Sequence, residues 1–312
     1  MRRFIIDTDT ASDDAVAIMM ALASPDIQVE AITIVAGNVA LAQASINARY
    51  TLEICSDITE HPIPVYEGCD RPWLREPSTA EWFHGDDGMS NGQYTRPRRE
   101  AQPEHAVPEL IKRFGAEPAQ LELVTLGPLT NIASALAIEP RLAHWVKHCY
   151  VMGGSAATLG NVTPAAEYNF WCDPEAAQRV MQSGMKLTLV GWELSCNEAT
   201  LDDTEMSRII ALGTPRARLA IESNRLALEA LRNLQGQTGL ALADPVAMAV
   251  AIDPEIVTDQ AFLPVHIETG SELTRGMSVV DRNNVMGNDP VANVCLAINT
   301  NRWKSLLLDT LA

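Results

Sequence analysis

The sequence has no apolar run approaching the roughly 20 residues that span a membrane, and it has no CxxC pair. Its six cysteines are scattered along the chain, which indicates neither a zinc site nor a disulfide framework. Positive charge is scarce as well, with 23 Lys and Arg against 40 Asp and Glu and a net charge of −17. Because binding to a phosphate backbone depends on Lys and Arg, we expect no nucleic acid polymer and no membrane as a partner.

The pattern predicts neither a signal peptide nor an interdomain linker. Asp7 follows the first apolar residues too early for the apolar segment of a signal peptide, so a cytoplasmic location is expected. No Ser/Gly-rich or low-complexity stretch divides the 312 residues, and a hydrophobic content of 47% supports a large core. We therefore expect residues 1–312 to form a single domain.

Apolar runs typical of strands alternate with segments typical of helices over the first two thirds of the chain. The predicted strands are 3–7, 29–36, 121–126, 148–152 and 186–191. The predicted helices between them are 13–23, 40–55, 104–115, 129–138 and 174–183. This alternation predicts an α/β fold with a mixed, mostly parallel central sheet flanked by helices. The last third is predicted to be more helical, with helices at 203–212, 215–233, 244–252 and 301–311 and strands at 265–269 and 277–281.

Four carboxylates follow the first predicted strand within eight positions, namely Asp7, Asp9, Asp13 and Asp14. Like charges this close raise one another's pKa unless a cation neutralises them, and carboxylate oxygens suit Ca²⁺ or Mg²⁺. The alternative is that Asp13 caps the following helix and the others are solvated, which explains one aspartate of the four. The strand-to-helix position favours a site, because ligands of open α/β sheets bind at the carboxyl ends of the strands.

Further polar or glycine-rich segments follow the other predicted strands. Gly37-Asn38 follows the second, Leu126-Gly-Pro-Leu-Thr-Asn the third and Met152-Gly-Gly the fourth. Each segment alone is typical of an ordinary turn. Their shared position at strand ends favours one site assembled from several loops.

These segments, with others further along, resemble the nucleoside hydrolases. The matching segments are Asp7-Thr-Asp-Thr-Ala-Ser-Asp-Asp-Ala, Gly37-Asn38, His84-Gly-Asp-Asp-Gly, Leu126-Gly-Pro-Leu-Thr-Asn-Ile-Ala, Val151-Met-Gly-Gly, Ala166-Glu-Tyr-Asn-Phe-Trp-Cys-Asp-Pro-Glu-Ala-Ala and Asp244-Pro. The resemblance implies a single α/β domain that binds Ca²⁺ and hydrolyses the N-glycosidic bond of small-molecule ribonucleosides. It also implies a homodimer or homotetramer.

Carried over by position, the resemblance implies specific roles for individual residues. Asp9, Asp14 and Asp244 would bind calcium through their side chains and Leu126 through its backbone carbonyl. Asp9 would also be the general base that takes a proton from a calcium-bound water. The residues implied to contact the ribose are Asp13, Asn38, Met152, Asn161, Glu167 and Asn169.

One position departs from the family pattern. Many members place a histidine directly before the late calcium-binding aspartate, as a proton donor to the leaving base, whereas this chain has Ala243. A general acid typically contributes about 10²- to 10⁴-fold in rate. Some purine-preferring relatives also lack this histidine and stack the base between aromatic rings. The candidate base-side residues here are Trp82, Phe83, His84, Trp192 and Arg225, although the aromatics are equally typical of packing and Arg225 of a solvated helix face.

Two other functions are consistent with part of the pattern. Ile6-Asp-Thr-Asp-Thr also fits the nucleophile motif of haloacid-dehalogenase-type phosphatases, with Asp7 as nucleophile and Mg²⁺ as cofactor. That interpretation leaves Asp13-Asp14 and Ala166-Glu-Tyr-Asn unexplained. Ala243 raises the second alternative, a ribose or nucleoside binder that kept the metal site and lost turnover; the retained Asp9 argues against it.

Overall fold

The computed structural model describes the whole chain except residues 60, 235 and 237. Its centre is an eight-stranded sheet in the order β3-β2-β1-β4-β5-β6-β10-β7. Neighbouring strands are parallel except β7, which runs antiparallel to β10 at one edge. The strands are β1 Arg2–Thr8, β2 Ile27–Ile34, β3 Val65–Glu67, β4 Leu121–Thr125, β5 Cys149–Met152, β6 Leu187–Val190, β7 Val257–Leu263 and β10 Ala292–Ile298. The predicted mixed, mostly parallel α/β sheet is thus confirmed.

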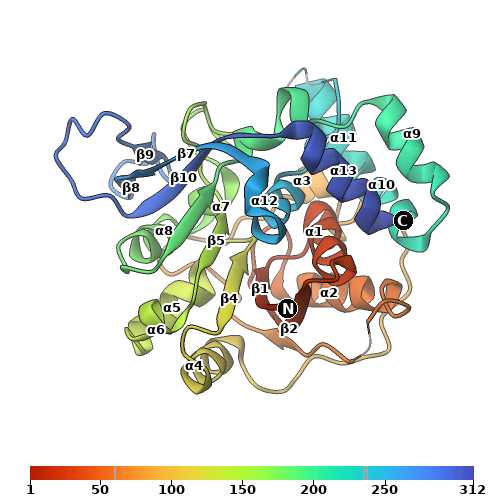
Figure 1. Cartoon of the computed structure of the whole chain (residues 1–312), viewed down its shortest axis with the longest axis horizontal. Helices are drawn as coiled ribbons and strands as arrows, with labels where there is room; N and C mark the ends of the chain where they lie inside the picture. Colours follow the sequence, from red (N-terminus) through yellow and green to blue (C-terminus); the bar gives the residue numbers. More distant parts are fainter. Residues whose placement is uncertain (60, 235, 237) are drawn as a thin grey trace.

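Helices cover both faces of this sheet (Figure 1). They are α1 Ser12–Ala23, α2 Leu41–Ile54, α3 Glu81–His84, α4 Ala106–Ala116, α5 Thr130–Ile138, α6 Leu142–Trp145, α7 Tyr168–Cys172, α8 Pro174–Met181, α9 Asp203–Ala211, α10 Pro215–Glu222, α11 Arg225–Leu234, α12 Ala243–Ile252 and α13 Thr300–Leu311. Short 3₁₀ turns lie at Trp192–Ser195, Asn197–Ala199 and Pro254–Ile256. Within the part of the chain that is described, no helix is long and apolar enough to cross a membrane.

Successive strand residues are buried on opposite faces of the sheet. Phe4 and Ile6 of β1 join the cluster under α1, α12 and α13, while Ile5 joins the cluster under α4, α5 and α8. A strand that is covered on both faces needs apolar residues at nearly every position. This explains why the central strands appear in the sequence as continuous apolar runs rather than as an alternating pattern.

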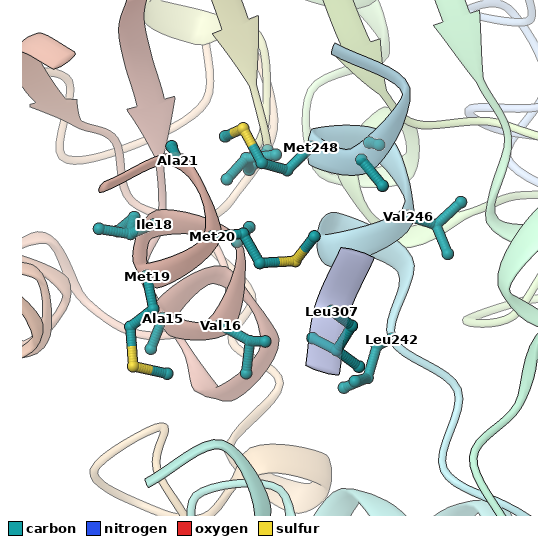
Figure 2. Packing of buried hydrophobic residues seen from close by; sticks show 14 of the residues in the cluster. Ala15, Val16, Ile18, Met19, Met20, Ala21, Leu242, Val246, Met248 and Leu307 are labelled. Atoms are coloured by element: carbon teal, nitrogen blue, oxygen red, sulfur yellow. The ribbon is translucent and has the colours of Figure 1, made fainter. Parts of the chain in front are cut away.

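Helices α1 and α12 pack against each other, although they lie far apart in the sequence. Figure 2 shows Met20 of α1 between the two helices, with Met248 of α12 and Leu307 of α13 nearby, whereas Val246 points away from α1 on the other side of α12. Below their first turns, the residues that the two helices contribute to this core cluster are apolar. This contact matters for the site because both helices begin at the carboxyl edge of the sheet.

The structure differs from the sequence-based prediction in several elements. The single helix predicted at 215–233 is two helices, α10 and α11, separated at Ser223-Asn224. Strands β3, β7 and β10 were not predicted, and β10 lies inside the sheet between β6 and β7. The predicted strands at 265–269 and 277–281 form a separate antiparallel pair, β8 Val265–Ile267 and β9 Ser278–Val280.

Candidate active site

The amino-terminal aspartates divide into two environments. Asp7 is the penultimate residue of β1, and its Oδ2 accepts hydrogen bonds from Thr33 Oγ1 at 2.5 Å and Asn131 Nδ2 at 2.9 Å. It therefore ties β1 to β2 and α5. Asp9 lies in the following turn, and Asp13 and Asp14 lie in the first turn of α1. The prediction that Asp13 and Asp14 begin a helix is confirmed.

Asp244 completes the carboxylate cluster from the first turn of α12. One carboxylate oxygen each of Asp13, Asp14 and Asp244 lie within 4.8 Å of one another. Asp9 is close enough for its charge to interact with those of Asp14 and Asp244. The packing of α1 against α12 thus brings together residues from opposite ends of the sequence.

The side chain of Asp9 is enclosed by backbone. Its Oδ2 accepts the Asn38 N–H at 2.6 Å, and its Oδ1 is buried with no hydrogen-bond partner among the described residues. A Cβ atom at Gly37 would lie 2.1 Å from Oδ2, and one at Gly127 would lie 2.6 Å from Oδ1. Any side chain at position 37 or 127 would collide with the Asp9 carboxylate, so glycine is required at both positions. This requirement explains the two glycines better than a general preference of turns for glycine does.

Burial and mutual repulsion raise the pKa of these carboxyls. Burial, then the charge of Asp14, holds the pKa of Asp9 well above its usual range. Burial, then Asp13, raises the pKa of Asp14 to about 7, and the same causes raise that of Asp244. Asp14 also accepts hydrogen bonds from Thr8 Oγ1 at 2.5 Å and from the Ala11 N–H at 2.9 Å.

The residues present fit a divalent cation. Three carboxylate oxygens converge, a fourth carboxylate has an unpartnered buried oxygen, and all are hard ligands. A cation at this position would offset the repulsion that raises the pKa values of Asp9, Asp14 and Asp244. The alternative that Asp13 merely caps α1 does not describe this arrangement, because Asp14 is the residue that bonds back to the helix start.

A cavity of about 110 Å³ opens beside the cluster. Asp13, Leu126 and Asp244 are part of its lining, and so are all the other residues predicted to contact the ribose. These are Asn38, Met152, Asn161, Glu167 and Asn169. The structure therefore brings together around one cavity the ribose-side residues that the sequence places on separate segments.

The polar wall of the cavity is fixed by hydrogen bonds around α7. Glu167 caps this helix, accepting the N–H groups of Asn169 at 2.8 Å and Phe170 at 3.2 Å, and it also accepts that of Gly154 at 2.8 Å. Burial raises the pKa of Glu167 to about 7, and these three hydrogen bonds oppose the rise. Asn169 Nδ2 donates to the Leu126 carbonyl at 2.8 Å. This hydrogen bond fixes the Asn169 side chain and the Leu126 carbonyl relative to each other.

The lining of the cavity also includes the predicted base-side aromatics. Trp82, Phe83, His84 and Trp192 all line the cavity. Trp82 is 57% exposed at the rim and contacts Phe83 edge to face at 5.5 Å between ring centroids. The indole N–H of Trp192 donates to the Leu159 carbonyl at 2.9 Å, which joins this side chain to the loop that carries Asn161.

The Gly-Asp-Asp-Gly segment after His84 is typical of a flexible lid, but His84 lies in a buried and fixed setting. It is the last residue of α3, is only 6% exposed, and its Nδ1 lies 2.7 Å from Ser12 Oγ. The loop after it is tied down, because the Asp87 carboxylate accepts the N–H groups of Met89, Asn91 and Gly92. Burial lowers the pKa of His84, with a smaller opposing effect from Asp13.

Arg225 lies outside the lining of the cavity, so the structure does not place it with the base-side residues. Its guanidinium pairs with Glu229 at 3.0 Å across one turn of α11 and donates to the Ser90 carbonyl at 3.1 Å. A solvated helix face, the alternative given for Arg225, describes this geometry. Its role is to hold α11 against the loop that follows His84.

Several lining residues were not predicted as site residues from the sequence. They are Ala80, Val162, Tyr168, Ser195, Leu231, Ala241 and Ala243, of which only Ala243 was singled out. Leu231 belongs to the apolar face of α11, where a leucine is typical of any packed helix. Ser195 follows the end of β6, and its position after a strand was the one available signal.

The matching family and the two relatives described here all carry the name nucleoside hydrolase or ribonucleoside hydrolase. Residues 4–305 match the family described as inosine-uridine preferring nucleoside hydrolase. The chain is 35% identical over 312 residues to the inosine-uridine preferring nucleoside hydrolase of Crithidia fasciculata, covering 99% of this chain and 97% of that protein. It is 36% identical over 312 residues to the pyrimidine-specific ribonucleoside hydrolase RihA of Shewanella sp. (strain ANA-3), covering 100% and 96%.

The fold of this chain is also similar to that of a solved nucleoside hydrolase. The plant nucleoside hydrolase PpNRh1 superposes with a TM-score of 0.93 at 29% sequence identity, and the match covers 99% of this chain and 98% of that one. The names of these relatives differ in the base they specify, so they do not indicate one base for this chain.

Proposed function

This chain belongs to the family of inosine-uridine preferring nucleoside hydrolases and is a ribonucleoside N-glycosidase, and we propose that it works through Asp9. Asp9 and Asp14 are not among the residues that line the cavity, but their charges act on that of Asp244, which does line it. The observation that supports this most is the meeting of Asp13, Asp14 and Asp244, with Asp9 close enough for its charge to act on them, beside a cavity lined by the side chains predicted to contact ribose. The phosphatase interpretation is wrong on family grounds. Its required nucleophile, Asp7, is also buried against Thr33 and Asn131.

The family is metal-dependent, and we propose Ca²⁺ as the ion for this chain. Asp9, Asp14 and Asp244 would hold it with their side chains and Leu126 with its carbonyl. When bound, a divalent ion lowers the pKa of an adjacent water and orients sugar hydroxyls. The second lone pair of the Leu126 carbonyl leaves room for a ligand besides Asn169.

The remaining chemistry is assigned to the chain's own residues. Asp9 accepts a proton from the attacking water, whose oxygen bonds to the anomeric carbon, while the electron pair of the C–N bond leaves with the base. The transition state has oxocarbenium character, so the carboxylates of Asp13 and Glu167 stabilise its positive charge. Asn161 and Asn169 hydrogen-bond to ribose hydroxyls, Asn169 through its side-chain oxygen because its Nδ2 donates to Leu126 and Met152, and Asn38 and Met152 shape the sugar pocket.

A substrate panel tests this proposal. Purified protein with calcium is offered inosine, uridine and other ribonucleosides, a nitrophenyl riboside and a set of sugar phosphates, and reducing sugar and phosphate are measured. We expect reducing sugar from at least one nucleoside and no phosphate release. Nucleoside binding without any release of sugar, even from the riboside, would support the non-catalytic binder that Ala243 suggested.

We further propose a homodimer or homotetramer in the cytoplasm, as the resemblance to the family suggests. Light scattering at working concentration measures the subunit number. A monomer that is fully active would contradict the first part of this proposal.

A further inference from the structure

The side chain of Ser12 meets the His84 ring at the start of α1. Ser12 is fully buried, and its Oγ lies 2.7 Å from His84 Nδ1. Its backbone carbonyl is held from the other side by Asn224 Nδ2 at 3.2 Å and Ser223 Oγ at 3.4 Å. Ser12 is therefore fixed at both ends, between the ring and the break that separates α10 from α11.

The direction of the Ser12–His84 hydrogen bond follows from the available partners. Among the described residues, His84 Nδ1 is the one acceptor within reach of the Ser12 hydroxyl. If the ring donated instead, the buried hydroxyl hydrogen would be unpaired, at a cost of about 1–3 kcal/mol. The hydroxyl thus donates, Nδ1 carries no hydrogen, and the hydrogen of the neutral imidazole is on Nε2.

The tautomer matters because His84 lines the cavity and Ala243 cannot donate. As the C–N bond breaks, negative charge develops on ring nitrogens or a carbonyl oxygen of the base. A preorganised N–H donor stabilises such charge in a site that excludes water. The Nε2 atom has no hydrogen-bond partner among the described residues, and Asp13, whose charge acts on the ring, lines the same cavity.

We propose that Ser12 is a positioning residue that holds His84 as the Nε2-protonated tautomer, so that this N–H is directed at the departing nucleobase. The inference rests on the proposed function and extends it to leaving-group stabilisation. The ring keeps its proton throughout, because the interaction is a hydrogen bond and not a proton transfer. Ser12 itself contacts neither substrate nor metal.

The kinetic test compares Ser12→Ala with two matched variants. Ser12→Thr keeps the hydroxyl, and Ser223→Ala removes a neighbouring hydroxyl that bonds the Ser12 carbonyl but not the ring. We expect Ser12→Ala to lower kcat on the best ribonucleoside of the panel about 10-fold or more. On the nitrophenyl riboside, whose leaving group is a stable anion, kcat should change far less. Ser12→Thr should restore the nucleoside rate, and Ser223→Ala should affect both substrates equally.

A spectroscopic test is independent of turnover. Nitrogen-15 NMR of the histidine rings, with the His84 signals assigned by their loss in His84→Gln, should show an unprotonated Nδ1 and a protonated Nε2 in the wild type. Ser12→Ala should give a mixture of tautomers. A protonated Nδ1 in the wild type, or equal loss of kcat on both substrates, overturns the role of Ser12. Absence of turnover on every substrate while the tautomer result holds would count against the proposed function instead.

Discussion

At the scale of the residue, the two oxygens of Asp9 have different surroundings. One accepts a backbone N–H from Asn38, and the other is buried without a partner among the described residues. An unpartnered carboxylate oxygen in a protein interior costs free energy unless a proton or cation reaches it. The first oxygen fixes the orientation, so the second is available to a cation or a water.

Asp9→Asn tests this assignment. The amide is nearly isosteric and fits between Gly37 and Gly127, so the fold and most nucleoside binding should be retained. Loss of the base should lower kcat by about 10²- to 10⁴-fold. Steady-state kinetics and circular dichroism measure the two effects. Undiminished turnover in this variant would exclude Asp9 as the base.

Glu167 gives a prediction about pH and stability. Its pKa is raised from 4.5 to about 7 in the folded protein, so folding takes up a proton between these values. This proton uptake adds to the free energy of unfolding at acidic pH, and the contribution is lost as the pH rises through 7. Relative to Glu167→Gln, the wild-type free energy of unfolding should fall on the order of 2 kcal/mol between pH 5 and pH 8. Urea titrations of both proteins with chelator present measure it, and parallel pH profiles would contradict it.

At the scale of the element, the contact between α1 and α12 supports the carboxylate cluster. Met20 is fully buried between them (Figure 2). Met20→Ala should leave a cavity and lower the free energy of unfolding by about 2–5 kcal/mol. Met286→Ala is the matched control, because Met286 is 59% exposed and its loss should matter little. Equal denaturation midpoints for the two variants would show that this contact is not a major source of stability.

The two helices that form this contact, α1 and α12, were both predicted from the sequence. Helix α1 was predicted because the residues from Asp14 onward are rich in helix formers, and α12 was predicted because its apolar residues recur at a helical period. Strand β10 was missed because Ala292-Asn-Val-Cys-Leu-Ala-Ile mixes strong and weak strand formers. The break at Ser223-Asn224 was missed because the apolar period continues across it.

The carboxylates and asparagines of the site could be predicted, because binding a metal or a sugar requires these residue types. Packing seldom requires carboxylates and asparagines at strand ends, so their presence there indicates a site, and the structure gathers them around one cavity. Leu231 and Ala241 could not be predicted, because an apolar wall and an apolar core need the same side chains. Ser12 could not be predicted either, since its partner is 72 positions away and only the fold brings His84 to it.

At the scale of the whole molecule, metal binding should contribute to stability. The buried carboxylates repel one another, and a cation that binds only the folded state stabilises it by about 2.7 kcal/mol at 100 times its Kd. Melting temperature should therefore rise with added calcium and fall with a strong chelator, which should also abolish activity. Asp244→Asn should reduce the calcium response. A metal-free protein with full activity would contradict the role of the ion.

The two groups of lining residues come from different parts of the architecture. The sugar-side residues come from strand ends, from the first turns of α1 and α12 and from α7 with the loop before it, whereas Trp82, Leu231 and Ala241 belong to other segments outside the sheet. Substitutions in the second group leave the parallel strands and the carboxylates untouched. Substitutions among these residues can therefore change which nucleobase is accepted without changing the residues that act on the ribose.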